Sequence, residues 1–194
     1  GFRPEDALWF AEDKHITYRP LANQILKKYP NKKNILEIGC GAGSLSYHLR
    51  DINSDLTVVT LDGNQGTLKS PYIKDGNHFI VLTDSDYELV DENNNIILFD
   101  LVLCFEHFEH IHVDRFGKFL ENIKKHSTKD TVIIATASTW PDGRDHCNVK
   151  NRDGWIEYLN SEGFEIIDNT IIEGNAPFNF EESLTSELVF KIKS

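Results

Sequence analysis

The densest group of chemically active side chains lies in EHFEHIH, residues 106–112, where two carboxylates and three imidazoles occupy seven positions. This density suits a general base or a metal site. If the segment begins a helix, Glu106, Glu109 and His110 share one face, at i, i+3 and i+4, while His107 and His112 point elsewhere. The structural alternative is a solvated helix start, where the helix dipole favours carboxylates.

A polar loop, STWPDGRDHCNVKN at residues 138–151, contains the second candidate group. Its position after a predicted strand is one at which loops often bind substrate. We expect His146 to act as a general base or metal ligand, and Arg144 to be available for an anionic group on the substrate. The alternative is a surface loop with an incidental histidine.

A glycine-rich turn follows the first apolar run, in ILEIGCGAGS at residues 35–44. Gly39, Gly41 and Gly43 would let the backbone approach a ligand closely ahead of a helix starting at Ser44. Their spacing differs from the dinucleotide pattern G-x-G-x-x-G. Asp62 follows about 20 residues later, where a carboxylate can accept hydrogen bonds from both ribose hydroxyls. A tight structural turn and a loop-capping aspartate are the alternatives.

Alternating elements would position these groups. Apolar patterning predicts helices at 19–29, 44–52, 114–126 and 152–164, and strands at 34–39, 56–62, 78–83, 99–104, 131–137, 164–172 and 186–193. The last strand alternates in a way that suits a sheet edge. Apolar strands separated by helices indicate an α/β fold with a parallel sheet covered on both faces, which binds ligands at the carboxyl ends of its strands.

Composition limits the classes of protein. The 194 residues suffice for one domain, and neither a membrane-spanning run nor a secretory signal is seen. Three cysteines, an odd number in unrelated sequence contexts, indicate a reducing, cytoplasmic setting. The net charge of −11 makes a nucleic-acid partner improbable. The chain starts at Gly1 and lacks methionine, so we expect a removed tag or a piece of a larger polypeptide.

Three segments together resemble the class I S-adenosylmethionine-dependent methyltransferases, close to the type 11/12 methyltransferase domains: LEIGCGAG, VVTLD and FDLVLCFEHFEHI. The resemblance runs over residues 21–194 as a single domain, preceded by an N-terminal arm or lid at 1–20. It implies a Rossmann-like, seven-stranded, mostly parallel sheet with helices on both faces and an antiparallel C-terminal strand.

The resemblance also implies roles for individual residues. The amino acid part of S-adenosylmethionine would be surrounded by Glu37, Gly39, Gly41 and Gly43. Asp62 would hold the ribose, and Asp84 and Ser85 would face the adenine, with Asp84 near its exocyclic amine. Phe105 would line the cofactor pocket. His15 and Tyr18 would belong to the lid over the cofactor, although a plain packing arm is equally consistent with that segment.

The pattern E-x-x-E-H has more than one meaning in this superfamily. It ligates a divalent cation in the small-RNA 3′-terminal 2′-O-methyltransferases and in some ubiquinone-biosynthesis O-methyltransferases, and is structural in many relatives. Mg²⁺, Mn²⁺ or Zn²⁺ would suit the mixed set of Glu106, Glu109, His110 and His146. However, the RNA enzymes carry an asparagine close to the fifth strand, where this chain reads TASTWPDG.

Our hypothesis is a methyltransferase that acts on a small polar acceptor and does not associate with a membrane. It would methylate an oxygen, less readily a nitrogen, of a sugar or nucleotide-linked metabolite, with His146, Glu106 and His110 as the catalytic groups. Two alternatives stay open. One is a metal-dependent methyltransferase of RNA 3′ ends, and the other is a non-catalytic cofactor-binding module of a larger protein.

Overall fold

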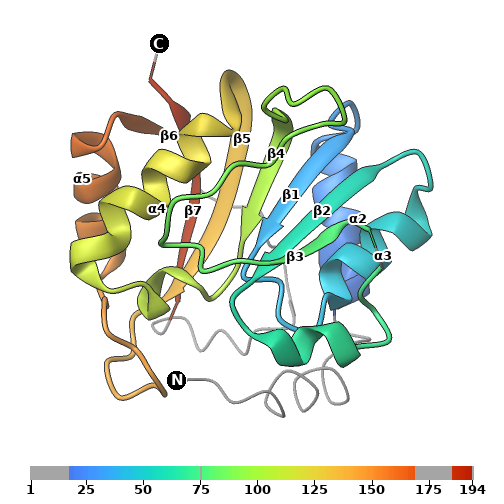
Figure 1. Cartoon of the computed structure of the whole chain (residues 1–194). Coiled ribbons are helices and arrows are strands. Elements are labelled where there is room, and N and C mark those ends of the chain that lie inside the picture. Colours follow the sequence, from blue (N-terminus) through green and yellow to red (C-terminus); the bar gives the residue numbers. More distant parts are fainter. Residues whose placement is uncertain (1–17, 75, 169–184, 194) are drawn as a thin grey trace.

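The computed structural model describes residues 18–74, 76–168 and 185–193, which form a seven-stranded sheet in the order β3-β2-β1-β4-β5-β7-β6 (Figure 1). Strands β1 to β5 pair in parallel, and β7 runs antiparallel to both of its neighbours. The strands are β1 (Asn34–Ile38), β2 (Thr57–Asp62), β3 (His78–Ile80), β4 (Phe99–Cys104), β5 (Ser127–Ser138), β6 (Phe164–Asp168) and β7 (Thr185–Ile192).

Helices cover both faces of this sheet. In Figure 1, α2 (Tyr18–Lys28) and α3 (Ser44–Ile52) lie on one face, and α4 (Val113–Lys125) and α5 (Arg152–Ser161) on the other. Two short 3₁₀ helices, η2 (Gln65–Lys69) and η3 (Phe108–His110), follow β2 and β4. The predicted Rossmann-like fold with an antiparallel C-terminal strand is therefore confirmed. None of the described helices combines the length and apolar character needed to cross a membrane.

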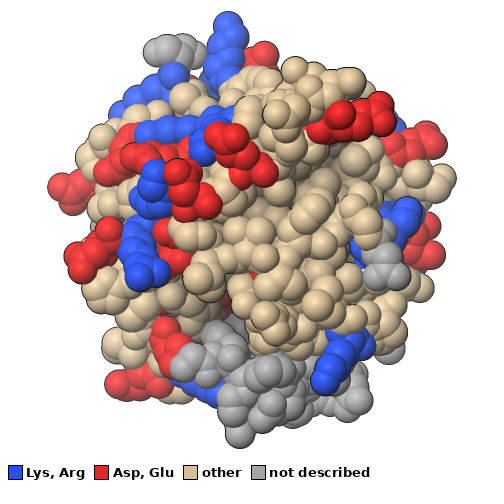
Figure 2. Space-filling model, in the orientation of Figure 1, with Lys and Arg blue, Asp and Glu red and all other residues tan. Residues whose placement is uncertain are grey.

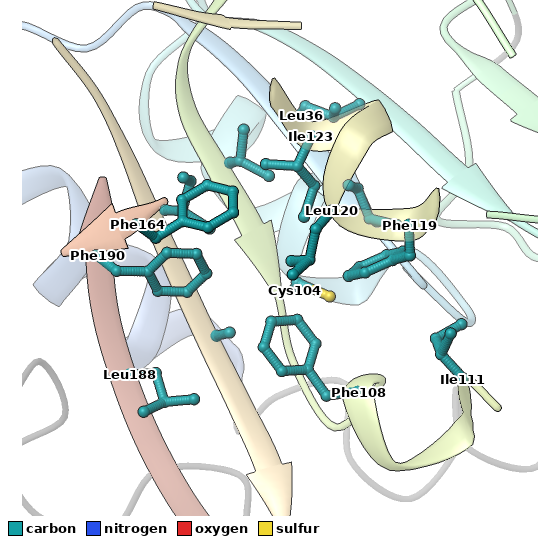
Figure 3. Packing of buried hydrophobic residues seen from close by; sticks show 14 of the residues in the cluster. Leu36, Cys104, Phe108, Ile111, Phe119, Leu120, Ile123, Phe164, Leu188 and Phe190 are labelled. Atoms are coloured by element: carbon teal, nitrogen blue, oxygen red, sulfur yellow. The ribbon is translucent and has the colours of Figure 1, made fainter. Parts of the chain in front are cut away.

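Side-chain alternation along the strands produces one core on each face. Ile35 of β1 belongs to the cluster beneath α2 and α3, whereas its neighbour Leu36 belongs to the cluster beneath α4 and α5. In the second cluster Phe108 packs against Phe116 and Trp155, with ring centroids 5.1 and 5.4 Å away. Figure 3 shows Phe108 directed from η3 into this core. The backbone that carries Glu109 and His110 is thus anchored by a buried aromatic ring.

Several predicted boundaries differ from the structure. The third strand ends at Ile80 instead of 83, and β5 starts four residues earlier than expected, at Ser127. The placement of the last strand at a sheet edge was wrong, since β7 lies between β5 and β6 and β6 is the edge. The predicted lid residue His15 and the end of the strand expected at 164–172 lie outside the described residues.

Candidate functional site

The glycine turn connects the end of β1 to the start of α3 at the carboxyl edge of the sheet. Gly39 and Gly43 adopt φ angles of +72° and +76°, in the left-handed region that favours glycine. A Cβ on Gly43 would also lie 2.5 Å from Ile73 Cδ1. The Gly39 amide donates to the carbonyl of Leu61 at 2.8 Å, which fixes the turn to β2. The turn is therefore tight and needs glycine for its own conformation, and its close approach to a ligand stays a prediction.

Asp62, at the end of β2, holds the same turn through its side chain. Oδ2 accepts from the Gly41 amide at 2.8 Å, and Oδ1 accepts from the Asn64 amide at 2.8 Å. Burial raises the pKa of this carboxyl group. The carboxylate thus caps the loop, which was the alternative to ribose binding predicted from the sequence. Each of its oxygens keeps a second lone pair that a ribose hydroxyl could use. Its role toward ribose stays a prediction.

A cavity opens beside the turn, lined by Tyr18, Glu37, Gly39, Cys40, Ala42, Ser44, Leu45 and Phe105. Three residues predicted for the cofactor site, Glu37, Gly39 and Phe105, are brought together there. Glu37 is 5% exposed and accepts a hydrogen bond from Ser46 Oγ, and burial raises its pKa to about 7. Tyr18, at the start of α2, forms part of the cavity wall. The sequence had indicated only that Tyr18 belongs to a lid over the cofactor.

The segment after β3 was predicted to face the adenine. Asn122 of α4 donates its Nδ2 to the carbonyls of Thr83, at 3.2 Å, and Ser85, at 2.6 Å. Asp84 Oδ2 lies 3.5 Å from Arg115 Nη1 of α4. The structure therefore shows what positions this segment, and contact of Asp84 and Ser85 with adenine stays a prediction.

Glu106 does not lie on a helix, contrary to the arrangement considered from the sequence. Its amide donates to the carbonyl of Thr136 on β5 at 3.0 Å, and its φ is +47°. This bond continues the β4–β5 pairing beyond β4, so a helical turn forms only at residues 108–110. A non-glycine residue in the left-handed region is strained, and such strain is concentrated at functional sites.

Glu106 and Glu109 nevertheless come together as a buried carboxyl pair. The two groups interact electrostatically, and Glu109 Oε1 accepts from the Ser138 amide at 3.1 Å. Burial raises the pKa of Glu106 to about 8 and that of Glu109 to about 7. The two carboxyl groups therefore titrate as a coupled pair, and both hold their protons to higher pH than free carboxyl groups do. Glu106 Oε1 and Glu109 Oε2 are buried without a hydrogen-bond partner among the described residues.

His110 and His146 complete this cluster from two different segments. Their ring centroids are 5.0 Å apart, and ligand atoms of Glu109, His110 and His146 all lie within 4.8 Å of one another. His110 Nδ1 lies 3.2 Å from the carbonyl of Asp145, and His146 Nδ1 lies 2.6 Å from the carbonyl of Trp140. Because a carbonyl oxygen only accepts, both Nδ1 atoms carry the proton and both Nε2 atoms carry the lone pair.

The predicted catalytic and metal-binding residues are thus largely assembled. Glu109, His110 and His146 form one cluster, and Glu106 joins it through Glu109. Arg144 forms an ion pair with Asp145 across 3.7 Å, and its role toward an acceptor stays a prediction. Sequence reasoning missed Thr136 and Ser138, whose backbone groups bind the two glutamates. Their position at the end of the predicted fifth strand, on the same edge of the sheet, could have indicated them.

Comparisons with known proteins agree with this architecture. A family model described as a methyltransferase domain matches residues 10–169. A ubiquinone biosynthesis O-methyltransferase of Rickettsia akari (strain Hartford) is 28% identical over 107 residues, which are 55% of this chain and 41% of that protein. The chain therefore spans less than half the length of this curated relative.

Solved structures resemble the whole fold at low identity. An S-adenosylmethionine-dependent methyltransferase from Clostridium acetobutylicum has a TM-score of 0.70 at 14% identity, covering 98% of each chain. The N-methyltransferase NodS from Bradyrhizobium japonicum WM9, in complex with S-adenosylhomocysteine, has a TM-score of 0.64 at 14% identity, covering 96% of this chain and 92% of its own. The chain belongs to the methyltransferase domain family and has the class I S-adenosylmethionine-dependent methyltransferase fold.

Proposed function

We propose that this protein binds S-adenosylmethionine in the cavity beside the glycine turn and transfers its methyl group to an oxygen of a small polar acceptor, such as a sugar or nucleotide-linked metabolite. One observation carries the proposal. Phe105 lines the cavity, and the next residue, Glu106, begins the carboxylate and imidazole cluster. A methyl donor in the cavity would therefore lie next to groups that can take a proton from a hydroxyl.

The cavity suits the charged amino acid end of the cofactor. Glu37 is a buried carboxyl group whose ionised form is favoured by the charge of Arg50 but forms no ion pair with a cation among the described residues. The ammonium group of S-adenosylmethionine would supply such a cation. The turn amides and Asp62 lie at the next position along the sheet edge, where they would meet the ribose.

Methyl transfer needs alignment and removal of one proton. The acceptor oxygen attacks the methyl carbon in line with the carbon–sulfur bond, whose electron pair stays on sulfur and neutralises the sulfonium. The hydroxyl proton passes to a base as the new carbon–oxygen bond forms. His146 is our candidate for that base, because Nδ1 donates to the Trp140 carbonyl and Nε2 holds the lone pair.

The neighbouring acidic pair would support this step. Ligand atoms of Glu109 and His146 lie within 4.8 Å, so an ionised Glu109 stabilises an imidazolium on His146. His110 offers a second imidazole with the same tautomer. Proton transfer by a positioned group contributes about 10²- to 10⁴-fold to a rate.

The same cluster fits a divalent cation. Two buried glutamate oxygens have no hydrogen-bond partner among the described residues, and both histidines direct their Nδ1–H to backbone carbonyls, as metal-ligating imidazoles commonly do. As the alternative to His146 acting as a free base, we propose Glu109, His110 and His146 as ligands, with Glu106 as the fourth, in which case His146 Nε2 would bind the ion. A bound ion would lower the pKa of an acceptor hydroxyl. Calorimetry with Mn²⁺ tests this: binding to the wild type should be lost in His146→Ala.

Two observations bear on the acceptor. By its name, the Rickettsia relative methylates oxygen, which favours oxygen over nitrogen here. Figure 2 shows lysines and arginines alternating with acidic side chains along one side of the molecule, with a broad uncharged area beside them, rather than a basic patch. An RNA substrate would require salt-dependent RNA affinity, which a net charge of −11 opposes.

Calorimetry with S-adenosylmethionine tests the first half of the proposal. The wild type should bind, and Asp62→Ala should bind more weakly; no binding by the wild type refutes the function. Acceptors are then screened by mass spectrometry for the gain of one methyl group. Cofactor binding with no turnover on any class of acceptor would favour the non-catalytic binding module instead.

A further inference from the structure

His107 lies between the two halves of the proposed cofactor site. Its imidazole packs directly on the glycine turn, since a Cβ added to Gly39 would lie 2.4 Å from His107 Nδ1 and 2.6 Å from its Cγ. On its other side, His107 Nε2 lies 2.9 Å from Thr83 Oγ1, in the segment after β3. One side chain from the β4–η3 junction therefore contacts both segments that we expect to hold the cofactor.

The surroundings keep this imidazole in one orientation. Phe119 of α4, which is fully buried, packs beside it with ring centroids 5.8 Å apart. Thr83, its hydrogen-bond partner, is 4% exposed and is held by Asn122 through its carbonyl. The ring is thus fixed by α4, by the post-β3 segment and by the glycine turn.

The imidazole is also uncharged. Burial, with a smaller contribution from the nearby His110, lowers the pKa of His107 to about 3. A neutral imidazole can pack against a backbone turn without repelling a sulfonium or ammonium cation in the adjoining cavity. A lysine or arginine at this position would carry a positive charge and would repel such a cation.

We propose that His107 is a positioning residue for the cofactor, setting the separation between the glycine turn at Gly39 and the segment at Thr83. This inference rests on the proposed function. S-adenosylmethionine would contact the turn with its amino acid end and the post-β3 segment with its adenine end. Both sets of contacts form together only if this separation matches the length of the ligand, so His107 pre-organises the site.

Two ligands that contain different parts of the cofactor test the inference. S-adenosylhomocysteine spans both ends, whereas 5′-methylthioadenosine carries the adenosine half without the amino acid. We expect His107→Leu, which keeps volume but loses the hydrogen bond to Thr83, to weaken S-adenosylhomocysteine about tenfold and 5′-methylthioadenosine less than about twofold. His107→Gln, which can still reach Thr83, should restore most of the loss. His112→Gln, an exposed histidine five residues later, is the matched control.

A second pair of variants tests the contact with Gly39. Gly39→Ala should weaken S-adenosylhomocysteine by a smaller factor in the His107→Ala background than in the wild type, because the added methyl group then has space. Equal losses for both ligands in His107→Leu, or independent effects of the two alanine substitutions, would overturn the inference. Failure of the wild type to bind either ligand would instead refute the proposed function.

Discussion

Cofactor affinity should depend on pH through Glu37. Burial raises the pKa of this carboxyl group to about 7, so about half of the unliganded protein carries it ionised at about pH 7 and about one molecule in eleven at about pH 6. An ammonium group beside Glu37 would favour the ionised form and lower that pKa in the complex. Binding therefore displaces a proton whenever the group starts protonated.

The size of the effect follows from those fractions. If only the ionised form binds S-adenosylmethionine well, the dissociation constant rises about fivefold between about pH 7 and about pH 6. Measurements should stay at or below neutral pH, because the free amino group of the ligand itself loses its proton above that range. Protons released on binding can be counted by calorimetry in two buffers of different ionisation enthalpy.

The matched variant is Glu37→Gln, which still accepts the hydrogen bond from Ser46 but has no charge to titrate. Its affinity should be lower than that of the wild type and flat over the same pH range. Wild-type affinity that stays constant from pH 7 to pH 6, or a variant that keeps the full pH dependence, would refute the assignment of Glu37 to the ammonium group.

Three further changes have defined outcomes. Without ligand, Glu37→Gln should raise the unfolding free energy by up to about 3 kcal/mol at pH 8, and this gain should disappear toward pH 4, where the wild-type carboxyl group is protonated. If urea denaturation shows no gain at pH 8, the wild-type protein does not contain a desolvated carboxylate at this position. Glu106→Gln should lower kcat about 10²-fold or more while cofactor affinity changes little, and wild-type kcat should rise with pH as the acidic pair ionises; a flat profile would exclude the pair. Gly43→Ala should cost about 1 to 2 kcal/mol of stability because its φ is +76°, and an unchanged denaturation midpoint would argue against the turn geometry.

The sequence could predict which segments meet, because parallel strands end at one edge of the sheet. Glu37, Asp62 and Glu106 each lie at or just past the end of a strand, and the strand order places them side by side. Apolar runs identified those strands, but the pairing of β1 with β4, which brings the glycine turn next to the carboxylate and imidazole cluster, is a crossover that their order along the chain does not give.

Local conformations that depend on distant partners could not be predicted in this way. Glu106 departs from a helix because its amide bonds to Thr136, thirty residues later in the sequence. Similarly, alternation in the last strand fits an edge and an interior position equally well, and the pairing of β6 with β7 decides between them. The contact of His107 with Gly39 also requires coordinates, since nothing in the spacing of the two residues indicates it.

The site concentrates features that cost stability. Glu37, Asp62, Glu106 and Glu109 all have a raised pKa through burial, and Glu106 and Asp145 adopt left-handed backbone conformations outside glycine. The buried aromatic core beneath η3 offsets that cost and holds the segment in place. Desolvated carboxylates with raised pKa values are poor contributors to folding but effective partners for a cation or a proton. Within the described part of the chain, their restriction to the carboxyl edge of the sheet is therefore better explained by ligand chemistry than by folding.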